Sequence, residues 1–422
     1  MTTDPRGFLR PLCGLGIAIL ALVSLSAALS AQTERVLYSF TSEPDGTGPI
    51  AGLVMDKTGA LYGTTVQGGD MVFKLAPPAK KGGSWTETTI YSFSTDLPDG
   101  DFPYDAGSLV LDKTGTGILY GTARDGGING YGTVFELTPP ASGDTWAETV
   151  LYAFNGGGDA QYPYAGLTMA GGALYGTTQW GGAFNEGAVF KLTPPTSPGG
   201  AWSETVLYSF TGGSDGGEPM SSPTVHGGML YGTTRFGGVS NINGVVYLLS
   251  PPAKGSTAWT ETVLHAFPTS GNDGANPYGA LIFDKQGALY GTTSGTFGAV
   301  PYGMVFKLTP PDWEETILYS FTNGSDGAAP EGSLIFDNTG ALYGTTAGTG
   351  AGTSHGSVFK LSPPAVVGDP WTETTLHTFT GGSDGGTPLD GLLLSGGVLY
   401  GTTYEGGPEP TCNCGVVFEV KP

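Results

Sequence analysis

Short hydrophobic runs separated by Gly, Pro and Asp recur along the whole chain. The string Leu-Tyr-Gly-Thr, followed by Thr or Ala, occurs seven times, with its Tyr at residues 62, 120, 175, 231, 290, 343 and 400. Three other patterns keep step with it: a Leu-Tyr-Ser-Phe-like run, a Val-Phe-Lys-Leu-like run, and an apolar run such as residues 52–56 directly before Leu-Tyr-Gly-Thr. All four are rich in β-branched and aromatic residues and end at turn formers, which is typical of β-strands.

The regular spacing of these four patterns predicts the fold. Successive copies are 53–59 residues apart, and four strands repeated seven times is the arrangement of a β-propeller. Tight turns such as Gly171-Gly172 join the first two strands of each copy. We therefore predict an all-β, seven-bladed β-propeller with four antiparallel strands per blade. Residues 31–422 would form this single domain from repeats of about 56 residues.

The two ends of the repeat array predict how the ring closes. The last copy stops after its third strand, residues 417–420, and the missing Leu-Tyr-Ser-Phe strand stands at residues 37–40. We expect residues 33–41 to complete the last blade, because a closed ring leaves no strand edge free for aggregation.

The first thirty residues have the features of a secretion signal. Arg6 and Arg10 precede an apolar segment, residues 14–29, and small residues follow at Ala28 and Ser30. We predict a signal peptide over residues 1–30 and a secreted protein, either extracellular, at the cell surface or periplasmic. No later segment is apolar enough to span a bilayer, so we expect no membrane insertion once the signal is removed.

Composition narrows the range of partners. Hydrophobic residues make up 39% of the chain, aromatic residues 11% and charged residues only 13%, and the net charge is −21. Such an acidic surface repels phosphate backbones and anionic lipid, which argues against nucleic-acid or membrane-surface partners. We expect a monomer.

The repeat resembles a known one. Leu-Tyr-Gly-Thr-Thr, Val-Phe-Lys-Leu-x-Pro-Pro and the Asp-Gly loop are similar to the GloVer tandem repeat of the choice-of-anchor family of exported bacterial proteins, over essentially the whole chain after residue 30. The resemblance implies export and surface display, with no catalytic residues to carry over. A looser similarity to NHL-type propellers, through the Asp-x-x-Gly-x-Leu-Tyr hairpin, implies the same fold.

Two polar features recur in step with the repeat and are interpreted as structural. An Asp stands four residues before a Pro in each copy, as in Asp326 and Pro330, and such an Asp in an Asp-Gly turn caps backbone N–H groups. A ring of carboxylates for catalysis or metal binding is the alternative. Six of the seven Trp residues stand in a repeated Trp-x-Glu, as Trp259 does, and are expected to pack between blades.

Residues that break the repeat are the better candidates for a ligand site. Two variable positions follow each Leu-Tyr-Gly-Thr-Thr, and a third follows each loop Pro; propellers bind ligands on the face where these loops lie. Aromatic, Arg and carboxylate side chains there suit a carbohydrate or a peptide. The candidate ligand-binding residues are Trp180, Arg124, Arg235, Phe236, Tyr404, Glu405, Tyr104, Tyr164 and Tyr278.

Metal and thiol chemistry are weaker candidates. Asp96, Asp99, Asp101 and Asp105 could hold Ca²⁺ or could form a solvated acidic loop. We expect no other cofactor. Cys412 and Cys414 could form a disulfide after export, or join His355 in a metal site.

These observations favour a binding or interaction module that recognises a glycan or a protein at one face of the ring. A polysaccharide-active enzyme, lyase or hydrolase, using the same face is an alternative from another class. A structural surface protein without a ligand is the third. An asymmetric cluster of His, Tyr and Arg, or a pair of carboxylates, would favour the enzyme.

Overall fold

The computed structural model describes residues 34–41, 44–66, 70–93, 108–142, 145–197, 199–239, 242–268, 274–295, 302–348, 355–366, 368–407 and 412–422. All of them belong to one unit, Gln32–Pro422. The predicted signal peptide, residues 1–30, lies outside the described residues. Within the described parts of the chain, no helix is long and apolar enough to cross a membrane.

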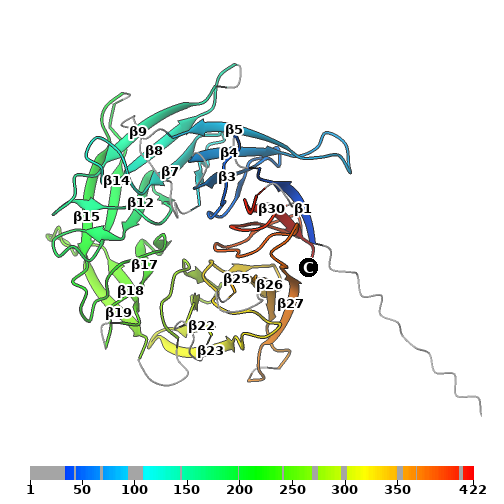
Figure 1. The fold of residues 1–422 in the computed structure, drawn as a ribbon. Coiled ribbons are helices and arrows are strands. Elements are labelled where there is room, and N and C mark those ends of the chain that lie inside the picture. The colour runs from blue at the N-terminus through cyan, green and yellow to red at the C-terminus, as the bar shows by residue number, and fades with distance from the viewer. Residues whose placement is uncertain are drawn as a thin grey trace, which may run out of the picture. The chain divides into compact units, whose positions relative to one another are not determined.

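Seven four-stranded antiparallel sheets form the blades, which confirms the predicted all-β propeller (Figure 1). Blade 1 contains β2 (Val54–Met55), β3 (Leu61–Thr65), β4 (Met71–Ala76) and β5 (Thr86–Ser92). Blade 2 contains β6 (Val110–Leu111), β7 (Leu119–Ala123), β8 (Thr133–Thr138) and β9 (Ala147–Ala153). Blade 3 contains β11 (Thr168–Ala170), β12 (Ala173–Thr178), β14 (Ala188–Thr193) and β15 (Ser203–Ser209). Blade 4 contains β16 (Thr224–His226), β17 (Met229–Thr234), β18 (Val245–Ser250) and β19 (Thr260–Ala266).

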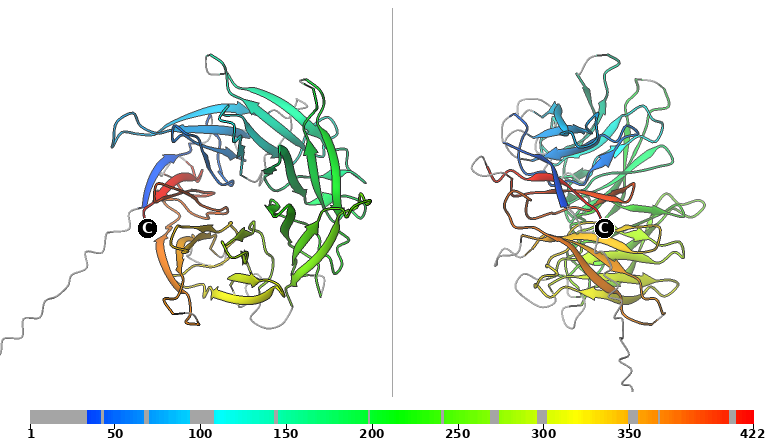
Figure 2. Two further views of the ribbon diagram at one scale, coloured as in Figure 1. Left: turned by 180° about the vertical axis from the view of Figure 1, so that it is seen from behind. Right: turned by 90° about the vertical axis from the view of Figure 1, so that its right-hand side faces the viewer.

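The remaining blades follow the same order around the ring, which Figure 2 shows from behind and from the side. Blade 5 contains β20 (Ile282–Phe283), β21 (Leu289–Thr293), β22 (Met304–Thr309) and β23 (Glu314–Ser320). Blade 6 contains β24 (Ile335–Phe336), β25 (Leu342–Thr346), β26 (Ser357–Ser362) and β27 (Thr372–Thr378). Blade 7 contains β28 (Leu393–Ser395), β29 (Val398–Thr403), β30 (Val416–Val420) and β1 (Glu34–Ser39). A further pair, β10 (Ala160–Gln161) and β13 (Trp180–Gly181), stands outside the blades.

The first strand of the chain closes the ring as predicted. β1 pairs antiparallel with β30, from Glu34 opposite Val420 to Ser39 opposite Val416, and supplies the outer strand of blade 7. Figure 1 shows β1 beside β30 although they lie at opposite ends of the chain. The ring is therefore closed by hydrogen bonds between the two ends of the chain.

The innermost strands are shorter than the sequence pattern suggested. Residues 52–56 were expected to form a strand, but only Val54–Met55 is paired in β2. The preceding Pro49 has no N–H to donate to a ladder. Gly52 lies against the neighbouring blades, since an added Cβ would come within 2.5 Å of Ser108 Oγ. The residues before β2 are therefore not paired in the sheet, and Ile50 and Ala51 face the centre of the ring.

A ladder of aromatic rings forms the core between blades. The Phe that ends each outer strand packs edge-on against the aromatic residue of the third strand in the next blade, with ring centroids 5.0–5.4 Å apart. The pairs are Phe40–Phe73, Phe93–Phe135, Phe154–Phe190, Phe210–Tyr247, Phe267–Phe306, Phe321–Phe359 and Phe379–Phe418. Burying one such ring contributes about 1.5–3 kcal/mol, and the repeated Phe therefore links every blade to the next.

The repeated Trp residues also lie between blades, as expected. Trp146 of blade 2 packs edge-on against Tyr62 of blade 1 at 6.1 Å, and Trp85 of blade 1 packs against Tyr400 of blade 7 at 6.5 Å. The Tyr in these pairs comes from Leu-Tyr-Gly-Thr. Two of the repeat's signature residues are thus explained by blade packing.

Candidate functional site

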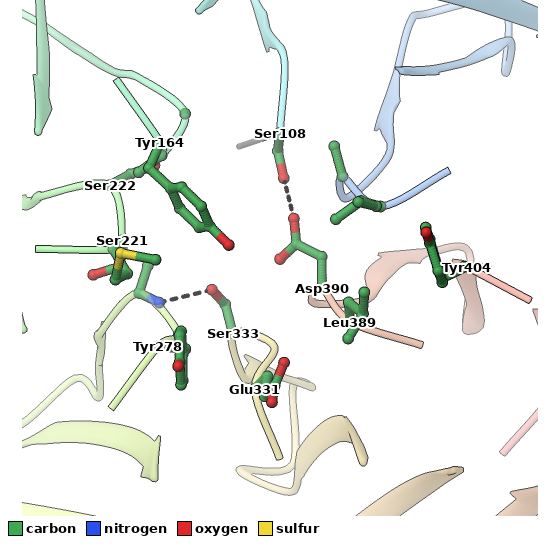
Figure 3. A pocket seen from close by; sticks show the side chains of 17 residues that line it. Ser108, Tyr164, Ser221, Ser222, Tyr278, Glu331, Ser333, Leu389, Asp390 and Tyr404 are labelled. Carbon is green, nitrogen blue, oxygen red and sulfur yellow. Dashed lines mark hydrogen bonds between the residues drawn. The ribbon is translucent and has the colours of Figure 1, made fainter. Parts of the chain in front are cut away.

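A cavity of about 390 Å³ opens at the centre of the ring, and all seven blades contribute to its wall. The wall is built from the segments between a loop Pro and the following inner strand, together with Tyr404 (Figure 3). The position directly after the loop Pro, which varies between the repeats, supplies Ile50, Tyr164, Met220, Tyr278, Glu331 and Leu389. The repeat thus brings its variable residues together at the axis.

The backbone before each loop Pro holds this wall in place. In six blades the residue preceding that Pro is left-handed, with φ between 51° and 62°; these residues are Gly48, Tyr162, Glu218, Asn276, Ala329 and Thr387. Proline disfavours helical φ and ψ in the residue before it, so this turn needs support from its surroundings. Glu218 shows the support: its N–H donates to Glu186 of blade 3, and its carbonyl accepts from Arg235 N of blade 4.

Threonines of the Leu-Tyr-Gly-Thr strands fix the wall from the neighbouring blade. Thr122 Oγ1 donates to the carbonyl of Ala165, and Thr177 Oγ1 donates to that of Ser221, at 3.0 and 2.9 Å. Thr345 Oγ1 makes the same bond to the carbonyl of Asp390, at 2.9 Å. The Thr and the carbonyl that accepts from it both recur in the repeat, so hydrogen bonds of this kind attach the cavity wall to the neighbouring blades.

Asp390 is the most unusual residue of the cavity, and our sequence analysis did not identify it. It stands two residues after the loop Pro, where the other described blades have small uncharged residues, namely Ala51, Ala165, Ser221, Gly279 and Gly332. Aligning the seven copies at that Pro shows an Asp at this position in only two of them, Asp105 and Asp390, and Asp105 lies outside the described residues.

The Asp390 carboxylate is held by three blades. Its Oδ2 accepts from Gly52 N at 2.6 Å and from Ser108 Oγ at 3.1 Å, while Oδ1 accepts from Gly391 N. Figure 3 shows the bond to Ser108 and the second carboxylate oxygen facing the cavity, on the side where the Tyr164 hydroxyl points inward. Burial raises the pKa of Asp390, and the hydrogen bonds from Gly391, Gly52 and Ser108 oppose that rise.

Three of the predicted ligand-binding residues line the cavity: Tyr164, Tyr278 and Tyr404. Two others lie outside it and meet at one rim residue that we had not predicted, Tyr162. The Arg124 guanidinium lies 5.4 Å from the centre of the Tyr162 ring, and the Trp180 ring lies 6.0 Å from it. We call Tyr162 and Trp180, with Arg124, the rim shelf.

The remaining predicted residues occupy equivalent rim positions. Arg235 lies 3.7 Å from Glu218 Oε2, and its guanidinium lies over the rings of Phe236 and Tyr278 at 4.6 and 5.6 Å. Glu405 accepts a hydrogen bond of 3.3 Å from Thr387 Oγ1. The structure does not place Arg235, Phe236 or Glu405 on the cavity wall.

Some of the candidates cannot be placed. Tyr104 and the four acidic residues considered for Ca²⁺, Asp96, Asp99, Asp101 and Asp105, lie outside the described residues. Within the described ranges, no three His, Cys, Asp or Glu side chains gather as metal ligands would. Cys412 and Cys414 are joined by a disulfide, so these thiols are not available to a metal with His355.

The repeated Asp of the Asp-Gly loops has a structural role in the blades where it is described. Asp326 accepts hydrogen bonds from the N–H groups of Thr322 and Gly324, at 2.8 and 3.0 Å, and from the Tyr319 hydroxyl at 3.1 Å. Asp45, Asp159 and Asp215 bind the preceding outer strand in the same way. The carboxylates close turns and do not line the cavity.

Replacing Asp326 with Ala should therefore reduce stability without affecting the cavity. We expect a loss of about 1 kcal/mol in the free energy of unfolding, as for other lost side-chain caps of backbone N–H groups. Urea titration followed by circular dichroism measures it. Unchanged stability together with lost ligand binding would instead support a functional ring of carboxylates.

Comparison with known proteins identifies the repeat and the fold. The sequence profile of the Gloeobacter/Verrucomicrobia repeat matches residues 23–242 and 221–422. No curated protein matches the chain. Among solved structures, the extracellular domain of a Bacteroides thetaiotaomicron protein described as a hybrid two-component system is 13% identical, with a TM-score of 0.56. That match covers 93% of this chain and 42% of the other, so this chain corresponds to less than half of that one.

A second solved structure has the length of a single propeller. It is a Bacteroides uniformis protein described as a 6-phosphogluconolactonase, 14% identical with a TM-score of 0.51. The match covers 82% of this chain and 95% of the other. At such low identities the likeness shows the fold alone, which an extracellular domain and an enzyme-like protein share.

Proposed function

The chain belongs to the Gloeobacter/Verrucomicrobia repeat family, and we propose that it is a secreted propeller that binds a glycan at the mouth of its ring. The observation that carries this proposal is that one loop contributes both to the central cavity and to the rim shelf. Tyr164 lines the cavity, and Tyr162, two residues earlier in the same loop, contacts Trp180 on the rim. A chain of sugar rings could occupy both at once.

The rim shelf has the properties of a stacking platform. Trp180 is 40% exposed, although most large hydrophobic side chains of the protein are buried. Its backbone is held in a small sheet, where Trp180 pairs with Gln161, so the ring is presented from a fixed support. Exposed aromatic rings on a fixed backbone offer apolar contact at a low entropic cost, and hydroxyl-rich surroundings suit the edges of sugars.

Replacing Trp180 with Ala tests the shelf. We expect oligosaccharide binding to weaken by roughly 1–3 kcal/mol, as on removal of an aromatic anchor. The change in stability should be smaller than for a Trp buried between blades, because Trp180 is 40% exposed. Isothermal titration calorimetry against a panel of soluble oligosaccharides measures the affinity. Trp259→Ala is the matched control: that Trp packs between blades, so its loss should lower the melting temperature and leave the affinity of the folded protein unchanged.

The panel also separates the other functions. If no glycan binds and a protein ligand does, the module recognises protein. If nothing binds, the structural role without a ligand is favoured. Equal affinity of the Trp180→Ala variant and the unchanged protein would remove the shelf from the site.

A polysaccharide-degrading enzyme is the second candidate, because two carboxyl residues line the same cavity. Burial raises the pKa of Asp390, which is the direction that favours a general acid, and Glu331 is also part of the wall. Release of reducing ends from polysaccharides, lost in both Asp390→Asn and Glu331→Gln, would establish this activity. Binding without release of reducing ends would exclude it for the substrates tested.

A further inference from the structure

The charged side chains that line the central cavity indicate the class of sugar that it would bind. Asp390 and Glu331 are both on the wall, and none of the described residues lining the cavity is Lys, Arg or His. Removing carboxylates from water is unfavourable unless a positive charge or hydrogen-bond donors compensate them. The wall itself supplies donors to Asp390 but no cation.

The Asp390 carboxylate is held in one position by hydrogen bonds from other blades. Its two partners on Oδ2, Gly52 N and Ser108 Oγ, belong to blades 1 and 2, more than 280 residues away in sequence. Gly52 has no room for a side chain, because an added Cβ would lie 2.5 Å from Ser108 Oγ and 3.1 Å from Asp390 Oδ2. The glycine, the serine and the aspartate therefore form one arrangement that three blades must build together.

This arrangement orients one carboxylate oxygen for a ligand. Oδ2 is taken by two donors from the protein, whereas Oδ1 accepts from the neighbouring Gly391 N and faces the cavity (Figure 3). A carboxylate oxygen can accept more than one hydrogen bond. Tyr164 stands on the same wall, and tyrosine rings attract cations through their faces and stack on sugars.

We propose that the cavity binds a sugar residue bearing a protonated amine, of the glucosamine type, with its ammonium group donating to Asp390 Oδ1. This inference rests on the proposed glycan-binding function and adds the class of sugar. A volume of about 390 Å³ accommodates a small ligand, and the neighbouring residues of an oligosaccharide would extend over Tyr162 to Trp180. The ammonium supplies a positive charge, which none of the described lining residues carries.

Three tetrasaccharides that differ chiefly at one ring position test the proposal: fully deacetylated chitosan, chitin and cellulose oligomers. Calorimetry should give at least about ten-fold tighter binding of the deacetylated oligomer, as expected for a charge-assisted hydrogen bond. Asp390→Asn, which keeps the size of the side chain, should reduce this preference to within about two-fold. Circular dichroism and thermal unfolding establish that the variant is folded.

A second variant and a control variant distinguish binding at the cavity from other causes of the preference. Glu331→Gln should also reduce the preference for the deacetylated oligomer, and it serves as the test if Asp390→Asn fails to fold. Asp369→Asn, at an exposed site in the loop between β26 and β27, should leave the preference unchanged. Equal binding of all three oligomers would overturn this inference and leave the proposed function standing.

Two other results would contradict the glycan-binding function or the location of the amine site. If none of the three oligomers binds while a lysine-rich peptide does, the cation comes from a protein and the glycan-binding function itself is wrong. If the preference for the deacetylated oligomer persists in Asp390→Asn and Glu331→Gln alike, the amine is bound elsewhere and the cavity is not its site.

Discussion

A protein lacking residues 31–41 should unfold at a much lower temperature than the complete propeller and should self-associate. The deletion removes β1, and with it Leu37 and Phe40, which are buried. Phe40 packs against Phe73 at 5.2 Å across the junction of blades 7 and 1. The loss of two buried side chains and a strand should cost on the order of 5 kcal/mol or more. It also leaves the edge of β30 unpaired, and an exposed edge is a template for association.

Point substitutions on the same strand make the test sharper if the truncated chain does not fold. Phe40→Ala should cost about 3–5 kcal/mol, as for other buried aromatic residues. Arg35→Ala is the control, because Arg35 is exposed and its ion pair with Glu419, at 3.9 Å, is of a kind worth less than about 1 kcal/mol. Thermal unfolding and light scattering measure both effects. A truncated protein that melts like the complete one and stays monomeric would show that β1 does not hold the ring closed.

The fold was predictable because every local signal occurs seven times. One Leu-Tyr-Gly-Thr-Thr is ambiguous, but seven copies in register with three other patterns permit few architectures. The closing strand followed from the same count, since the missing strand of the last copy was present at the other end of the chain. The roles of Trp146 and Asp326 followed as well, because a residue that recurs from copy to copy is explained by what the copies share.

The site was predictable only where it breaks the repeat. The position after the loop Pro was identified as variable, and Tyr164 and Tyr278 indeed line the cavity. Asp390 was missed because Leu-Asp-Gly reads locally as one more turn, and its partners Gly52 and Ser108 come from other blades. Such contacts depend on the closure of the ring and not on neighbouring residues.

The location of the rim shelf also lay beyond the sequence. Trp180 was expected to share a site with Arg124, and both do contact Tyr162. Neither of them lines the cavity, and Trp180 is held in its own place by the pairing of β10 with β13. Two-residue strands of this kind leave no periodic pattern to detect.

A last consequence of the repeat concerns acidic pairs between blades. The Glu of Trp-x-Glu lies half-buried on an outer strand and near the Asp of the preceding Asp-Gly loop. Burial first, and then the charge of that Asp, raises the pKa of Glu87, Glu204 and Glu261 to about 7. Glu34, beside Asp384, behaves in the same way. The folded protein thus binds protons at several junctions that the unfolded chain releases near pH 4.5.

The direction of the resulting pH dependence follows from these shifts. A carboxyl group whose pKa is raised on folding contributes to stability as long as it is protonated in the folded protein. That contribution decreases as pH rises from about 4.5 to about 7 and is fully lost above that range. Other carboxylates act oppositely at lower pH, because hydrogen bonds from Thr339, Ala341 and Tyr343 lower the pKa of Asp337. Their stabilisation is lost only as pH falls below about 4. Stability should therefore be greatest near pH 4.5–5.

We expect the melting temperature to be higher at pH 5 than at pH 8 by roughly 5 °C or more. Replacing Glu87, Glu204 and Glu261 together with Gln should raise the melting temperature at pH 8 and reduce its dependence on pH, because Gln stays neutral at every pH. Glu314→Gln, at an exposed position of β23, should change neither. Differential scanning calorimetry between pH 4 and pH 9 measures the profile. A melting temperature that rises from pH 5 to pH 8, or a triple variant with the unchanged profile, would mean that these pairs do not govern the stability of the ring.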